Sequence, residues 1–122
     1  MNKLPRDLSK LIKGRVIDPS DGEYISSTKI DNGRIEHHPQ LVVVPADADD
    51  VAAIVKYVRK HKIGMTTRCG GHSATGYCLN SQGIVLDIRQ LNKRVLDRDS
   101  GLLTIGMGNI WRDVYDLSLI HI

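Results

Sequence analysis

The chain has 122 residues, of which 41% are hydrophobic, 25% are charged and 4% are aromatic. This length holds one domain with a modest core. Because Phe is absent, that core must consist mainly of Val, Ile and Leu, which favours strands and α/β packing. The net charge of +3 is spread without a Lys/Arg block, and no apolar run reaches the length of a membrane span. We therefore expect neither a nucleic-acid partner nor a membrane.

The two cysteines, Cys69 and Cys78, are too few for a disulfide framework. A single bridge between them stays open, but we expect two free thiols. The first residues lack the apolar core of a signal peptide. This favours an intracellular location, although the compartment itself stays undetermined.

Residues 1–38 are polar and rich in turns, and we expect them to form an N-terminal extension. Within the extension, a short helix that ends at Gly14 would place three apolar residues on one side: Leu8, Leu11 and Ile12.

The next stretch predicts a strand, a helix and a second strand. Residues 41–44 form a short apolar run typical of a strand buried on both faces. Asp47 can cap the following helix, and Gly64 can take the left-handed conformation that ends it. Residues 65–68 then form the second strand, parallel to the first. The apolar stripe of the helix consists of Val51, Ile54, Val55 and Val58.

Residues 68–76, Arg-Cys-Gly-Gly-His-Ser-Ala-Thr-Gly, follow that second strand. Glycines allow positive φ and close approach to the backbone, and successive N–H groups in such a loop can bind a phosphate. The loop would leave the C-terminal end of a parallel strand, where open α/β sheets commonly bind ligands. A phosphate-holding loop is one interpretation, and an ordinary glycine-rich turn is the alternative.

The rest of the chain predicts mainly strands and a last helix. Residues 83–88 form a strand, and residues 95–97 and 102–105 flank a turn as an antiparallel hairpin. A second glycine turn covers residues 106–109, and a helix begins near residue 110. No capping residue or polar tail ends this helix, so we expect the chain to be an N-terminal portion of a longer protein.

Other phosphate and metal motifs fit the loop poorly. A Rossmann loop needs Gly-x-Gly-x-x-Gly opening a helix, and a P-loop needs Gly-Lys-Ser/Thr; neither pattern is present. Cys69, His72 and Cys78 are three soft ligands, whereas a closed zinc site needs four with paired spacing. We expect no metal site.

The run Arg68-Cys69-Gly70-Gly71-His72-Ser73 resembles the signature of FAD-linked oxidases of the p-cresol methylhydroxylase / vanillyl-alcohol oxidase (PCMH) type. It is most similar to the berberine-bridge-enzyme-like and 6-hydroxynicotine-oxidase-like members. The likeness extends, in order, over residues 39–115. It implies an α+β fold that corresponds to the first lobe of a PCMH-type FAD-binding domain, in truncated form. This lobe would consist of a βαβ unit followed by a β-hairpin. This partial domain would cover residues 39–122. Further matching runs are 39–45, 83–88, 91–92, 104–108 and Trp111.

The resemblance also implies a cofactor site. In the family, the backbone of the double-glycine segment contacts the FAD pyrophosphate, and in many members the His of the signature is bonded covalently to the 8α-methyl carbon of the flavin. His72 would carry this bond, or would only donate hydrogen bonds in the loop. Two departures are Cys69, where Ser or Gly is usual, and Met107, where Ala is frequent. The implied cofactor-binding residues are Arg68, Cys69, Gly70, Gly71, His72, Ser73 and Gly76.

By resemblance, the complete protein would be an FAD-dependent oxidase that takes hydride from a C–H bond next to oxygen or nitrogen in a small molecule, with O₂ reoxidising the flavin. The family's catalytic acid and base lie beyond the matched residues, so no catalytic residue is assigned. The alternative is an inactive α/β fragment or interaction domain that does not hold FAD by itself. Substrate and oligomeric state are not determined by the sequence.

Overall fold

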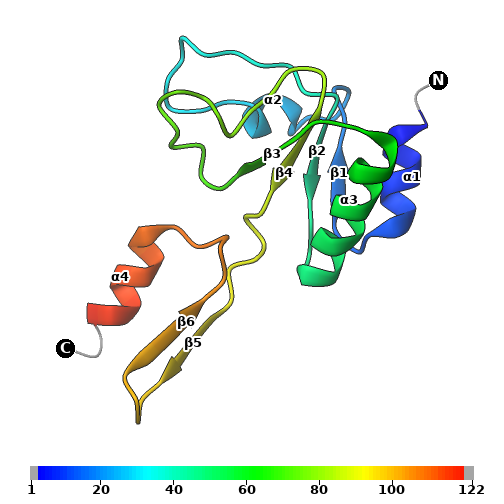
Figure 1. Ribbon diagram of the computed structural model, residues 1–122. Coiled ribbons are helices and arrows are strands. Elements are labelled where there is room, and N and C mark those ends of the chain that lie inside the picture. The colour runs from blue at the N-terminus through cyan, green and yellow to red at the C-terminus, as the bar shows by residue number, and fades with distance from the viewer. Residues whose placement is uncertain (1–2, 120–122) are drawn as a thin grey trace.

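The computed structural model describes residues 3–119, and Figure 1 shows the arrangement of its helices and strands. The elements in chain order are α1 (Leu4–Leu11), β1 (Arg15–Ile17), α2 (Tyr24–Ser27), β2 (Leu41–Val44), α3 (Ala48–His61), β3 (Met65–Arg68), β4 (Ile84–Asp87), β5 (Arg94–Asp97), β6 (Leu102–Ile105) and α4 (Trp111–Leu119). The expected α+β class is confirmed.

Four strands form one sheet in the order β1-β2-β4-β3. Strands β2 and β3 both run parallel to β4, and β1 is antiparallel to β2. The strand–helix–strand prediction is therefore confirmed, with β4 inserted between the two strands of the unit. This order makes β3 an edge strand, and the glycine loop begins at its C-terminal end.

Both faces of the sheet are covered, which confirms that β2 is buried on both sides. Because side chains alternate along a strand, each central strand contributes to two cores. One core lies under α1 and α3 and includes Leu41, Val43, Ile54, Ile84 and Leu86. The other packs on α2 and on the loop before β4, and includes Ile17, Tyr24, Val42, Leu79 and Val85.

Helix α3 begins as predicted, because the side chain of Asp47 accepts a hydrogen bond from the Asp50 N–H at 3.0 Å. Its end differs from the prediction. Lys62, not Gly64, takes the left-handed conformation, with φ 53° and ψ 44°. The Lys62 N–H donates to the carbonyl of Arg59 within the last turn, so the helix closes two residues before the glycine.

The apolar stripes of the helices are narrower than predicted. On α3, Ile54 and Val58 are buried, whereas Val55 is 43% exposed. On α1, Leu8 is buried and Leu11 is 51% exposed. In both helices the exposed residue is next in sequence to a buried one: Val55 follows Ile54, and Leu11 precedes Ile12. Because each residue turns the helix face by about 100°, it points to the side of the buried stripe.

Residues 3–38 take part in the same core. Helix α1 packs on α3, and β1 adds a strand that sequence analysis did not predict, pairing Val16 with Val43. The carboxylate of Asp50 is buried and accepts backbone N–H groups from Lys13, Gly14 and Ala46 at 2.8–2.9 Å. These bonds join α1 and β1 to the start of α3.

The expected hairpin is confirmed as β5 and β6, and together with α4 it extends away from the four-stranded sheet (Figure 1). We call α1 to β4 the sheet body and β5, β6 and α4 the hairpin arm. The Gly108 N–H donates to the Leu91 carbonyl at 2.9 Å, and a Cβ at Gly108 would lie 2.0 Å from the Ile88 carbonyl oxygen. The glycine turn is thus needed where the arm returns to the body. No helix in residues 3–119 is long and apolar enough to cross a membrane.

Candidate functional site

The glycine loop adopts the left-handed backbone that its composition predicts. Gly70, Gly71 and Gly76 have φ of +73°, +72° and +75°. All three glycines also lack room for a side chain. A Cβ at Gly71 would lie 2.9 Å from a guanidinium nitrogen of Arg68, and one at Gly76 would lie 2.5 Å from Ile35. Both the positive φ angles and the close packing of Arg68 and Ile35 against the loop therefore favour glycine at these positions.

A charged cluster supports the base of the loop. Asp87 ends β4 and is fully buried, and its carboxylate accepts from Arg68 at 2.9 Å and from Arg89 at 2.7 Å. Burial alone would raise the pKa of Asp87, but the hydrogen bonds from Arg89 and the charges of both arginines hold its pKa below the usual value. Because Arg68 is the first residue of the signature, this cluster ties the loop to the centre of the sheet.

A second support comes from residues 29–32, which we call the 29–32 segment. Arg68 donates to the Lys29 carbonyl at 3.0 Å, the Asp31 N–H donates to the Gly71 carbonyl at 3.2 Å, and the Asn32 amide donates to the Ala74 carbonyl at 2.9 Å. The segment lies about forty positions earlier in the chain, yet it contacts the loop at three points along its length.

His72 is held by the same segment. Its Nδ1 lies 2.7 Å from Oδ2 of Asp31, and both side chains are exposed. A Cβ placed on Gly70 would lie 3.0 Å from Nε2 of His72, so the opposite edge of the ring rests against the loop backbone. The imidazole is therefore oriented although it is open to solvent.

Four consecutive backbone N–H groups of the loop are free. None of the described residues accepts a hydrogen bond from the N–H of Gly70, Gly71, His72 or Ser73. A backbone N–H that is buried without a partner is rare, and Gly71 is the buried residue among these four. Free donors in a left-handed glycine loop are suited to an anion.

A hollow of about 610 Å³ lies beside these donors, between the loop and the start of α4. Burial, followed by the charge of Asp87, raises the pKa of the Cys69 thiol, which keeps that thiol neutral at the hollow wall. The side-chain oxygen Oδ1 of Asn109, another wall residue, is buried and accepts no hydrogen bond from any described residue. The lining consists of Cys69, His72, Ile105, Gly106, Met107, Asn109, Ile110, Trp111, Arg112 and Val114.

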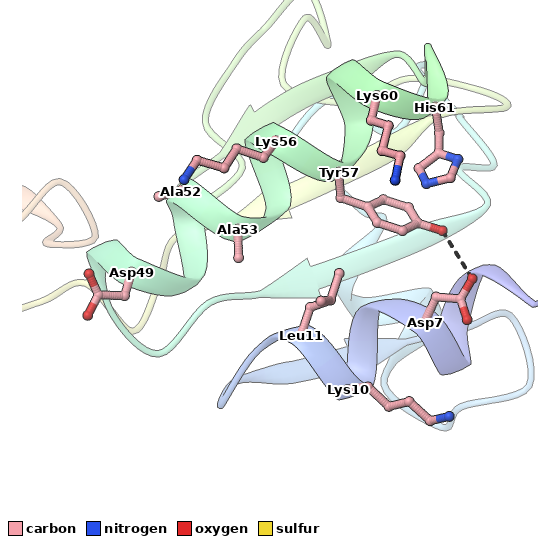
Figure 2. A pocket seen from close by; sticks show the side chains of 10 residues that line it. All are labelled: Asp7, Lys10, Leu11, Asp49, Ala52, Ala53, Lys56, Tyr57, Lys60 and His61. Carbon is pink, nitrogen blue, oxygen red and sulfur yellow. Dashed lines mark hydrogen bonds between the residues drawn. The ribbon is translucent and has the colours of Figure 1, made fainter.

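A second hollow, of about 740 Å³, lies between α1 and α3 (Figure 2). It shares no lining residue with the first. Tyr57 points across it and donates to Asp7 at 3.4 Å, and its ring lies 4.2 Å from that of His61. The rest of its wall is formed by small or apolar side chains, lysines and one aspartate, without a converging set of acids, bases or nucleophiles: Lys10, Leu11, Asp49, Ala52, Ala53, Lys56 and Lys60.

The structure brings together some of the predicted cofactor-binding residues. Cys69 and His72 share the first hollow. Arg68 points beneath the loop to Asp87, and Gly76 is buried against Ile35. These two residues shape the loop from behind. Ser73 lies within the loop, with its Oγ 3.3 Å from that of Thr75. The cofactor role of all seven residues stays a prediction.

Sequence analysis missed three contributors to this site: Asp31, Asp87 and the hollow wall from the start of α4. Asp87 carried a signal, because a carboxylate at the end of an otherwise apolar strand must be paired when it is buried. Asp31 carried none, since it lies in a polar stretch with no periodicity. Both cysteines are free and partly buried, as expected.

Residues 39–118 match the family model described as an FAD binding domain. The chain therefore belongs to the FAD-binding family of PCMH-type FAD-linked oxidases, as its signature suggested.

Among curated relatives, the chain is 36% identical over 113 residues to (R)-6-hydroxynicotine oxidase of Paenarthrobacter nicotinovorans, covering 93% of this chain and 24% of the relative. It is 30% identical over 101 residues to an uncharacterized FAD-linked oxidoreductase of Bacillus subtilis, covering 82% of this chain and 23% of that protein. The chain thus spans about a quarter of the length of these relatives.

Solved structures agree with the fold. The crystal structure of 6-hydroxy-D-nicotine oxidase from Arthrobacter nicotinovorans superposes with a TM-score of 0.80 at 36% identity, over 84% of this chain and 23% of that one. A variant of the berberine-bridge-enzyme-like protein 1 of Physcomitrella patens superposes with a TM-score of 0.87 at 24% identity, over 97% of this chain and 26% of that one. The second match supports the fold alone.

Proposed function

We propose that this chain is the FAD-binding portion of an FAD-dependent oxidase that acts on a small organic molecule. The observation that carries the proposal is the run of four free N–H groups from Gly70 to Ser73, beside a hollow of about 610 Å³. The membership in the FAD-binding family supports FAD as the anion.

The residues present fit a pyrophosphate. The loop donors are backbone groups, which need no free cation, and Arg68 is already paired with Asp87. Arg112 adds an exposed positive charge to the wall of the hollow. In this proposal Gly70, Gly71, His72 and Ser73 contact the pyrophosphate, Cys69 lines the same wall, and Arg68 and Gly76 hold the shape of the loop.

His72 would also tether the cofactor through its imidazole. The bound FAD would supply hydride-accepting chemistry, with O₂ as the final acceptor. What the chain itself contributes is a nucleophilic ring that is already oriented by Asp31, next to a thiol that burial keeps neutral and hence unreactive. The residues of this chain do not identify the substrate.

The test is His72→Ala in the native protein. We expect flavin to stay with wild-type polypeptide after acid denaturation and to be released from the variant, because only the imidazole can form the bond. His38→Ala is the matched control, since His38 is also exposed and lies outside the loop. Flavin that remains attached to the His72→Ala polypeptide would refute the tether, and a wild-type protein that binds no FAD at all would refute the proposed function.

A further inference from the structure

Asp31 is the titratable side chain that contacts His72. Its Oδ2 lies 2.7 Å from Nδ1 of the ring. An ionised carboxylate only accepts hydrogen bonds, so the ring must donate from Nδ1. The contact therefore fixes both the plane of the imidazole and the position of one proton.

Asp31 is itself anchored. Its backbone N–H donates to the Gly71 carbonyl at 3.2 Å, and its neighbour Asn32 donates to the Ala74 carbonyl at 2.9 Å. These two hydrogen bonds hold the Asp31 segment on the loop, in addition to the contact between the carboxylate and the ring. An exposed ion pair between free side chains contributes little, because both must be ordered. Here the backbone bonds have already ordered one partner.

We propose that Asp31 is the positioning residue for His72: it holds the imidazole against the glycine loop and accepts the Nδ1 proton when the ring is bonded to flavin. This inference rests on the proposed function. Bond formation would join Nε2, the ring nitrogen without a proton, to the flavin methyl carbon; that carbon would lose one hydrogen, and Nδ1 would lose its proton. O₂ takes the two electrons and two protons as hydrogen peroxide, which closes the balance. Asp31 is the acceptor for the proton that the ring loses.

The first test measures covalent attachment in native protein prepared without flavin and then mixed with FAD. The readout is the fraction of flavin that survives acid denaturation as a function of time. We expect Asp31→Ala to slow attachment by about a hundredfold, as for loss of a general base. Asp31→Glu, which keeps a carboxylate, should restore most of the rate. Total flavin bound before denaturation should stay equal in all three proteins.

Asn32→Ala is the matched structural control, because it removes one bond between the 29–32 segment and the loop but leaves the Asp31–His72 contact. We expect it to slow attachment much less than Asp31→Ala does, because the Asp31 N–H bond to the Gly71 carbonyl still holds the segment on the loop. Equal rates in wild type and Asp31→Ala would overturn the inference. Equal slowing in Asp31→Ala and Asn32→Ala would also overturn it, since the segment and not the carboxylate would then be responsible.

A second readout does not need flavin. In flavin-free native protein labelled with ¹⁵N-histidine, and with His72→Ala as the assignment reference, Nδ1 of His72 should resonate as a protonated nitrogen. Asp31→Ala should shift this signal toward a mixture of tautomers. An Nδ1 signal that Asp31→Ala leaves unchanged would overturn the inference. If the shift is observed but wild-type protein forms no covalent flavin, the Asp31 contact stands and the tether fails, so the two failures are distinguishable.

Discussion

The sheet body and the hairpin arm bury their apolar residues to very different degrees. In the body, the side chains of β2 and β4 are almost fully enclosed on both faces. In the arm, six large apolar side chains are 37% to 77% exposed, although Val114 is buried. These exposed residues are Val95, Leu102, Ile105, Met107, Trp111 and Tyr115.

The difference follows from the number of layers. Four strands with helices on one face and α2 with its loops on the other can exclude water from both sides of the sheet. A two-stranded hairpin with one helix cannot, and such a hairpin is marginal by itself. Trp111 and Tyr115 cover part of each other, with stacked rings 5.7 Å apart, but stay exposed on α4. We therefore place most of the stabilising free energy in the body.

The largest expected effect is at the junction between the body and the glycine loop. Asp87→Ala leaves Arg68 and Arg89 without their buried partner, and we expect it to lower the free energy of unfolding by about 3–5 kcal/mol. Urea denaturation followed by circular dichroism measures this. Asp99→Asn, in the exposed hairpin turn, is the control and should be neutral. A cost below that of an ordinary surface change would mean that the cluster does not support the sheet.

A pair of leucine substitutions compares the two regions directly. Leu41→Ala in β2 removes a fully buried side chain and should cost about 2–5 kcal/mol. Leu102→Ala in β6 removes a side chain that is 68% exposed and should change stability by less than about 0.5 kcal/mol. The same denaturation experiment measures both. Similar costs at the two positions would contradict the contrast drawn between body and arm.

A smaller effect concerns pH and Asp50. Burial alone would raise the pKa of Asp50, but the backbone N–H groups of Ala46, Lys13 and Gly14 hold it below the usual value. A carboxyl with a lower pKa in the folded state stabilises the protein above its unfolded pKa, about 3.9, and this contribution is lost as pH falls through the folded-state value.

Asp50→Asn should therefore cost about 2 kcal/mol at neutral pH, because the amide cannot satisfy three donors. The variant should also lose part of the acid dependence of stability below pH about 4. Unfolding free energies measured across the acid range test both statements. Parallel pH profiles of wild type and variant would show that another carboxyl, such as Asp87, accounts for the acid dependence.

Much of the fold could be predicted from local patterns. The buried strand at 41–44, the helix capped by Asp47 and the hairpin each have a signal within a few residues. Strand β1 has none. It is three residues long, and it forms because β2 offers an unpaired edge to Val16 and its neighbours.

The features of the candidate site also divide into those that the sequence predicts and those that only the tertiary structure reveals. The sequence by itself determined the glycine loop and the family, and it singled out His72 as the predicted tether, because these depend on residue types at close spacing. Only the tertiary structure decided that residues 29–32 lie along the loop, that Asp31 orients His72, and that Asp87 supports Arg68 from below. The reason is physical. Hydrogen bonds and ion pairs between residues about forty positions apart leave no periodicity in the chain, and they exist only once strand pairing and core packing have brought those residues together.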